Sequence, residues 1–229
     1  MANPAEVTKS GLRNFWRSYM RHRYSILFYS LLFTLVAVPT LNAFNSSGIL
    51  IDSLLAADLL LAAVMPVNAG KNRRLLLFLM IVVWLARPVE LWLHHPTLSV
   101  ITLGIWTLIG LLAAAAALRY AFRARTIDAE HLYAALSAYL LAGLFFGLFY
   151  WVLAQLGPGA FTTSGTFSRM TAIYFSFVTL ATIGYGDIVP RTDVARGLAI
   201  IEGVGGQLFL AVLVARLVSL YTKKAETEQ

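Results

Sequence analysis

The sequence predicts an all-α membrane protein with six transmembrane helices and a shorter re-entrant helix between the fifth and the sixth. Of the 229 residues, 59% are hydrophobic and 13% are charged, and the mean hydropathy is +0.73. Six separate apolar runs are each long enough to cross a hydrocarbon core of about 30 Å as a helix. A composition this apolar excludes an ordinary soluble domain.

Short polar turns join the first expected span to the second, and the third to the fourth, so the spans within each pair run antiparallel. The expected spans are residues 24–44, 49–67, 75–93, 98–118, 132–156 and 194–221. A Gly-Pro-Gly sequence at 157–159 ends the fifth span, and residues 168–181 are then apolar but too short to cross. Such a half-helix is tolerated at membrane depth only where protein buries it.

Lys and Arg gather on one side of the expected bundle. The N-terminal segment, the 71–74 turn, the 119–125 linker and the C-terminal tail are basic, whereas the alternate turns contain no Lys or Arg. The positive-inside rule therefore places both termini in the cytoplasm. We expect a multi-pass protein of a plasma membrane, the prokaryotic inner membrane in particular. The net charge of +7 reflects this orientation and lipid contact, and we expect no nucleic-acid partner.

The N-terminal segment has the pattern of an amphipathic helix lying in the membrane interface. Its basic stripe recurs every four residues on one face and consists of Lys9, Arg13, Arg17 and Arg21. Apolar residues recur on another face with helical spacing. We expect membrane lipids, anionic ones in particular, as partners of this stripe. The alternative is a basic tail without a defined structure.

Residues 179–187, which read TLATIGYGD, are the most informative stretch of the chain. They resemble the selectivity-filter signature of potassium channels, Thr-x-x-Thr-x-Gly-Tyr-Gly-Asp. Ile183 stands where the signature usually has Val, but both are β-branched and the position contributes its backbone carbonyl. A lone Gly-x-Gly also makes tight turns. Here the full pattern follows an apolar half-helix and lies between two long apolar spans.

The resemblance implies that backbone oxygens replace the water that a potassium ion loses. Carbonyls alternate in direction along a strand, so aiming them at one axis requires some residues at positive φ, which glycine reaches at little cost. The filter implied by the resemblance consists of Thr182, Ile183, Gly184, Tyr185 and Gly186, the first four of which hold K⁺. The hydroxyl of Thr182 adds an oxygen at the inner end.

The same resemblance implies roles for residues around the filter. The ring of Tyr185 points away from the pore and braces the filter, and Asp187 attracts cations at the outer mouth. Thr179 and Glu202 support the filter from behind. One chain supplies one filter loop, and a ring of carbonyls needs several copies about one axis. The resemblance therefore implies a homotetramer with cyclic symmetry.

The overall plan resembles six-transmembrane, voltage-gated-like potassium channels of prokaryotic type, with a fourth span that lacks gating arginines. Residues 98–118 contain no charge. Gating charge gains about 2.3 kcal/mol per charge per 100 mV, so we expect weak or no voltage dependence. The expected segments are an interfacial helix (1–23), a four-helix sensor-like domain without gating charges (24–118), a basic linker (119–131), a pore domain (132–222) and a short cytoplasmic tail (223–229).

Three charges inside the second and third spans predict an internal network. Asp58, Arg87 and Glu90 come to similar depths when each residue advances about 1.5 Å. Charges inside a membrane are costly and usually paired, so we predict a structural charge network. A relic charge-transfer site or a proton-sensitive switch is the alternative.

The sixth span has a local weak point. Gly203, Gly205 and Gly206 lie within four residues, and glycine destabilises a helix interior by about 1 kcal/mol relative to alanine. The resemblance implies a gating hinge, for which Gly206 is the best match. Close helix packing through small residues is the alternative.

Together these features predict a potassium-selective channel that conducts K⁺ passively. The sequence shows no nucleotide-binding loop, no catalytic nucleophile with paired carboxylates and no metal-ligand spacing. We therefore expect no enzyme activity and no cofactor, with K⁺ as the permeating ion. We also expect no cytosolic sensor domain in so short a tail. A less selective cation channel is one alternative. A non-conducting membrane scaffold that acts as a lipid or ligand receptor is the other.

Overall fold

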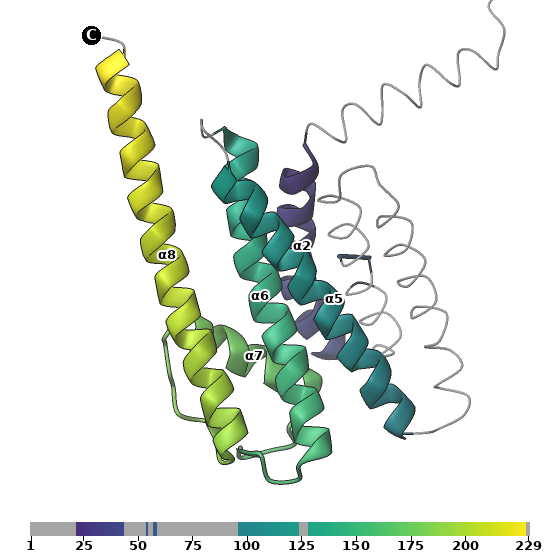
Figure 1. Cartoon of the computed structure of the whole chain (residues 1–229). Helices are drawn as coiled ribbons and strands as arrows, with labels where there is room; N and C mark the ends of the chain where they lie inside the picture. Colours follow the sequence, from purple (N-terminus) through teal and green to yellow (C-terminus); the bar gives the residue numbers. More distant parts are fainter. Residues whose placement is uncertain (1–21, 44–53, 55–56, 59–95, 124–127, 228–229) are drawn as a thin grey trace, which may run out of the picture.

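The computed structural model describes residues 22–43, 54, 57–58, 96–123 and 128–227 (Figure 1). In chain order the elements are α2 (Arg23–Ala43), α5 (Pro96–Arg123), α6 (Ala129–Leu156), β1 (Phe161–Thr162), α7 (Arg169–Leu180), β2 (Val189–Pro190) and α8 (Asp193–Thr227). The described part of the chain is therefore almost entirely helical.

Four of these helices, α2, α5, α6 and α8, are long and apolar enough to cross a membrane. They coincide with the first, fourth, fifth and sixth expected spans, although α8 continues to Thr227 where the sequence predicted an end at residue 221. The expectation of a helical membrane protein is thus confirmed. The second and third expected spans lie outside the described residues apart from 54, 57 and 58, and so does the helix with the basic stripe.

Helix α6 is the centre of the packing, because α5, α2 and α7 all lie against it. Buried apolar side chains fill these interfaces, among them Leu31 of α2, Trp106 of α5 and Phe145 of α6. Helix α8 contacts α7 near its start and leans away from α6 toward its C-terminus (Figure 1). Only residues 124–128 separate α5 from α6, so the fourth expected span packs on the α6 of its own chain.

Gly147 allows α7 to approach α6 closely. A Cβ at position 147 would lie 2.6 Å from the Ile173 Cα and 2.9 Å from its Cγ1. The Ile173 backbone cannot move away without displacing α7, so we expect Gly147→Ala to destabilise the folded protein by about 1–3 kcal/mol. The measurement is the Tm of the detergent-purified protein.

Gly104→Ala on α5 is the matched control for this prediction. A Cβ there would meet no atom within 4 Å. Alanine stabilises a helix interior by about 1 kcal/mol relative to glycine, so the Tm should stay level or rise. Equal Tm values for the two variants would contradict the packing argument.

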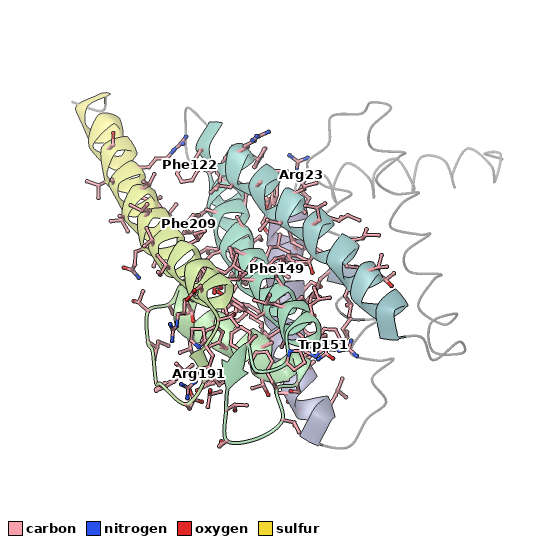
Figure 2. The ribbon with its side chains drawn as sticks, turned by 60° about the horizontal axis from the view of Figure 1, so that its bottom comes forward. Arg23, Phe122, Phe149, Trp151, Arg191 and Phe209 are labelled. Atoms are coloured by element: carbon pink, nitrogen blue, oxygen red, sulfur yellow. The ribbon has the colours of Figure 1, made fainter. Side chains whose placement is uncertain are left out.

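Polar groups organise the region where α5 ends and α6 begins. Asp128 caps α6, because its carboxylate accepts a hydrogen bond from the His131 backbone at 3.0 Å. Desolvation raises the pKa of Asp128, but hydrogen bonds from the backbone and ring of His131 outweigh it and lower the pKa below the usual aspartate value. Arg216 of α8 donates to the carbonyl of Phe122 in the last turn of α5, where a cation is favourable. The Phe122 ring lies near Phe209 of α8 (Figure 2).

The segment between α6 and α8 folds back on itself. Ser168 caps α7 by accepting a hydrogen bond from the Thr171 backbone at 3.1 Å. Helix α7 therefore begins at Arg169, one residue inside the expected half-helix. Strands β1 and β2 then pair antiparallel and draw the two ends of the loop together. The sequence did not predict this pair, because two-residue strands are too short to show an alternating pattern.

Candidate functional site

Residues 182–187, the predicted filter segment, leave α7 through two hydrogen bonds to the last turn of that helix. The Thr182 amide donates to the Thr179 carbonyl at 2.9 Å, and the Ile183 amide donates to the Val178 carbonyl at 2.9 Å. The start of the segment is thereby fixed to the C-terminal end of α7. At that end the helix dipole places partial negative charge, which favours a nearby cation.

The backbone of the filter segment alternates in conformation. Its φ angle is +55° at Thr182, +61° at Gly184 and +80° at Gly186. Positive φ at every second residue breaks the alternation of an ordinary strand, so successive carbonyls can face the same side. The sequence analysis associated positive φ with glycine. Thr182 is the one non-glycine residue with positive φ in the described part of the chain, and a β-branched residue adopts that conformation at a cost.

An aromatic pair links the outer end of the segment to α7. The rings of Tyr174 and Tyr185 are parallel, with centroids 6.5 Å apart. Tyr174 thus contacts the expected filter residue Tyr185, a role that the sequence analysis missed.

Glu202 lies in a buried polar cluster between α6, α7 and α8. Its side chain is 1% exposed and belongs to α8. One carboxyl oxygen accepts a hydrogen bond from the Tyr150 hydroxyl of α6 at 2.7 Å, and the other meets the Ser176 hydroxyl of α7. The Ser176 hydroxyl also lies 2.7 Å from the Gly143 carbonyl. This cluster ties α6, α7 and α8 together at one point.

The region that contains these features is also the part of the chain that resembles known proteins. Residues 135–223, which run from α6 through α7 into α8, match the family described as ion channel. Two pore potassium channel c of Oryza sativa subsp. japonica is 41% identical over 91 residues, which are 39% of this chain and 18% of the relative. Two-pore potassium channel 4 of Arabidopsis thaliana is 47% identical over 58 residues, 24% of this chain and 20% of the relative.

Protein LctB of Bacillus caldotenax is 32% identical over 99 residues, and the match covers 40% of this chain and 73% of that protein. This chain belongs to the ion channel family. It spans about a fifth of the length of the two plant channels, 20% and 18%. No solved structure matches it. The family consists of ion channels, so membership indicates a transport-type protein.

The three glycines of the channel's α8 differ in their surroundings. A Cβ on Gly206 would lie 2.5 Å from the Leu180 carbonyl oxygen, so α8 approaches the end of α7 there. A Cβ on Gly203 would lie 3.6 Å from the Thr179 carbonyl, and one on Gly205 would meet no atom within 4 Å. Gly205 and Gly206 line an apolar cavity of about 300 Å³ between α5, α6 and α8.

One further polar contact of the channel's α8 reaches the filter segment. The Gln207 side-chain amide nitrogen donates a hydrogen bond to the Thr182 hydroxyl oxygen at 3.1 Å. The sequence analysis did not single out Gln207. A polar residue directly after the glycines of an otherwise apolar span was the signal that could have found it.

Two of the expected sites fall largely outside the described residues. Asp58 is buried, and its carboxylate accepts a hydrogen bond from the Ser30 hydroxyl of α2. This partner was not predicted. Arg87 and Glu90, the other members of the predicted charge network, lie outside the described residues, and so does the basic stripe.

Proposed function

We propose that four copies of this chain form a potassium-selective pore, with Thr182, Ile183, Gly184 and Tyr185 as the K⁺ ligands. The observation that carries the proposal is the positive φ at every second residue from 182 to 186. Carbonyls that face one side can replace the hydration shell of an ion, as in a potassium-channel filter. The Thr182 hydroxyl supplies a further oxygen, and the Asp187 carboxylate raises the cation concentration at the outer mouth.

The surface of the single chain supports assembly around the filter. Ile183 is 53% exposed and Tyr185 is 68% exposed, and every residue from 181 to 187 is exposed in the single chain. Large apolar side chains of α8 are exposed as well, among them Ile201, Val204 and Leu208. Such a surface needs a partner, and a cyclic tetramer covers it with neighbouring copies while closing a ring of carbonyls.

The absence of charge within the apolar part of α5 supports weak voltage dependence. No charged residue occurs between positions 96 and 118 of this helix. Movement of α5 would therefore carry little gating charge through the membrane field. In this proposal α8 bends at Gly205, where a side chain would meet no neighbour. The termini are cytoplasmic, and anionic lipids bind the basic stripe.

The test is current through the purified protein in planar bilayers under opposed K⁺ and Na⁺ gradients, scanned over voltage. We expect a reversal potential that follows the K⁺ gradient and an open probability that is nearly flat in voltage. A reversal potential midway between the equilibrium potentials of K⁺ and Na⁺ would indicate the less selective cation channel. No current in any lipid mixture, with the tetramer intact, would refute the proposal and favour the scaffold.

A further inference from the structure

Gln207 stands at the inner end of the filter because of how α8 packs. The preceding residue, Gly206, brings α8 against the Leu180 carbonyl at the end of α7, as the 2.5 Å separation from a Cβ there indicates. The next residue, Gln207, is thereby placed beside Thr182, the first residue of the filter. The Gln207 amide nitrogen lies 3.1 Å from the Thr182 hydroxyl oxygen. Both side chains are exposed in the single chain, so a crowded core does not impose this contact.

The hydrogen bond restricts what the Thr182 hydroxyl can do. A hydroxyl oxygen has two lone pairs and one hydrogen that rotates to suit its surroundings. The Gln207 donor occupies one lone pair and opposes rotation of the hydroxyl, which leaves the second lone pair for a cation. Without this donor the hydroxyl hydrogen can turn toward the ion, where its positive end repels the cation.

We propose that Gln207 is a positioning residue for the innermost ion site and sets how tightly the Thr182 hydroxyls hold a cation that enters from the cytoplasmic side. The inference rests on the proposed function, because the site exists only in an assembled pore. Four Gln207 side chains would then surround the entrance to the filter. Their amide oxygens accept hydrogen bonds from the water of an arriving or departing ion.

Internal Ba²⁺ is the probe, since it is a divalent cation close in size to K⁺ and blocks current when it occupies a K⁺ site. We expect Gln207→Leu, which keeps the approximate size but cannot donate, to weaken internal Ba²⁺ block at least about tenfold, because the loss of even one hydrogen bond implies a change of that size and the tetramer loses four. Gln155→Leu, the same change at the other end of the pore domain on α6, should leave block unchanged. Unaltered block in Gln207→Leu would overturn the inference.

A double-mutant cycle tests whether Gln207 acts through Thr182. Thr182→Val removes the acceptor, so adding Gln207→Leu to it should weaken Ba²⁺ block no further. Independent effects that multiply would show that Gln207 acts on the ion by another route, and the inference would fail.

The inference and the proposed function fail in different ways. A wild-type protein without K⁺ current refutes the proposed function, whereas normal wild-type current with unaltered block in Gln207→Leu refutes only the role of Gln207. For a variant that carries no current, the rise in Tm of the purified protein on adding K⁺ replaces block as the readout. We expect a smaller rise in Gln207→Leu than in wild type, and an equal rise would overturn the inference.

Discussion

Gly184→Ala is expected to reduce the selective potassium current at least about tenfold while the protein still folds and assembles. Gly184 has φ of +61°, and a Cβ there would meet no atom within 4 Å. The substitution therefore costs backbone strain alone, about 1–2 kcal/mol per chain and about 4–8 kcal/mol for four chains around one axis. The chain relieves this strain by leaving the left-handed conformation, which turns a carbonyl away from the ion path. The measurement is K⁺ conductance and the K⁺/Na⁺ reversal potential in bilayers.

Gly165→Ala is the matched control for the filter variant. This glycine lies in the loop before α7, a Cβ there would meet no atom within 4 Å, and its φ is outside the left-handed region. Its current and selectivity should equal those of the wild type. Selective current at the wild-type level in Gly184→Ala would mean that the left-handed backbone at this position is not required, and the proposed filter geometry would be wrong.

Local sequence signals account for the parts of the fold that were predicted well. The long apolar runs gave α2, α5, α6 and α8, because a helix must bury or embed an apolar face over its whole length. The apolar stretch 168–181 and the Gly-Pro-Gly turn located both ends of α7 and the C-terminal end of α6 to within one residue. The two filter glycines were also recognisable, since positive φ at these positions depends on residue type and spacing.

The sequence could not predict which residues far apart in the chain contact one another in the folded protein. Tyr150 and Ser176 lie 52 and 26 residues from Glu202, and neither stands out in the pattern of its own helix. The left-handed conformation of Thr182 comes from the way the segment is held between α7 and α8, against the preference of a β-branched residue. The sequence likewise left two explanations open for the three glycines of α8, a gating hinge and close helix packing. Only their surroundings separate Gly206, which packs, from Gly205, which is open.

The buried cluster around Glu202 leads to the second large expected effect. Glu202→Ala should destabilise the protein by about 2–5 kcal/mol from the cavity alone, because the side chain is 1% exposed. The Tyr150 hydroxyl would also lose its acceptor, which adds about 1–3 kcal/mol for a buried donor left unsatisfied, whereas the Ser176 hydroxyl keeps the Gly143 carbonyl. We expect a large drop in Tm of the detergent-purified protein and loss of K⁺ current.

Glu202→Gln tests whether the Glu202 side chain stabilises the protein through its hydrogen bonds or through a negative charge. Ser176 has one hydroxyl hydrogen but lies against two acceptors, the Gly143 carbonyl and a carboxyl oxygen of Glu202. Both contacts are satisfied together only if Glu202 carries a proton that it donates to Ser176, while its other oxygen accepts from Tyr150. A glutamine amide reproduces this arrangement without a charge, so Tm and current should stay close to wild type. Infrared spectra should show a protonated carboxyl band in the wild type that is lost in the variant. A collapse of Glu202→Gln equal to that of Glu202→Ala would mean that an ionised carboxylate holds the three helices together.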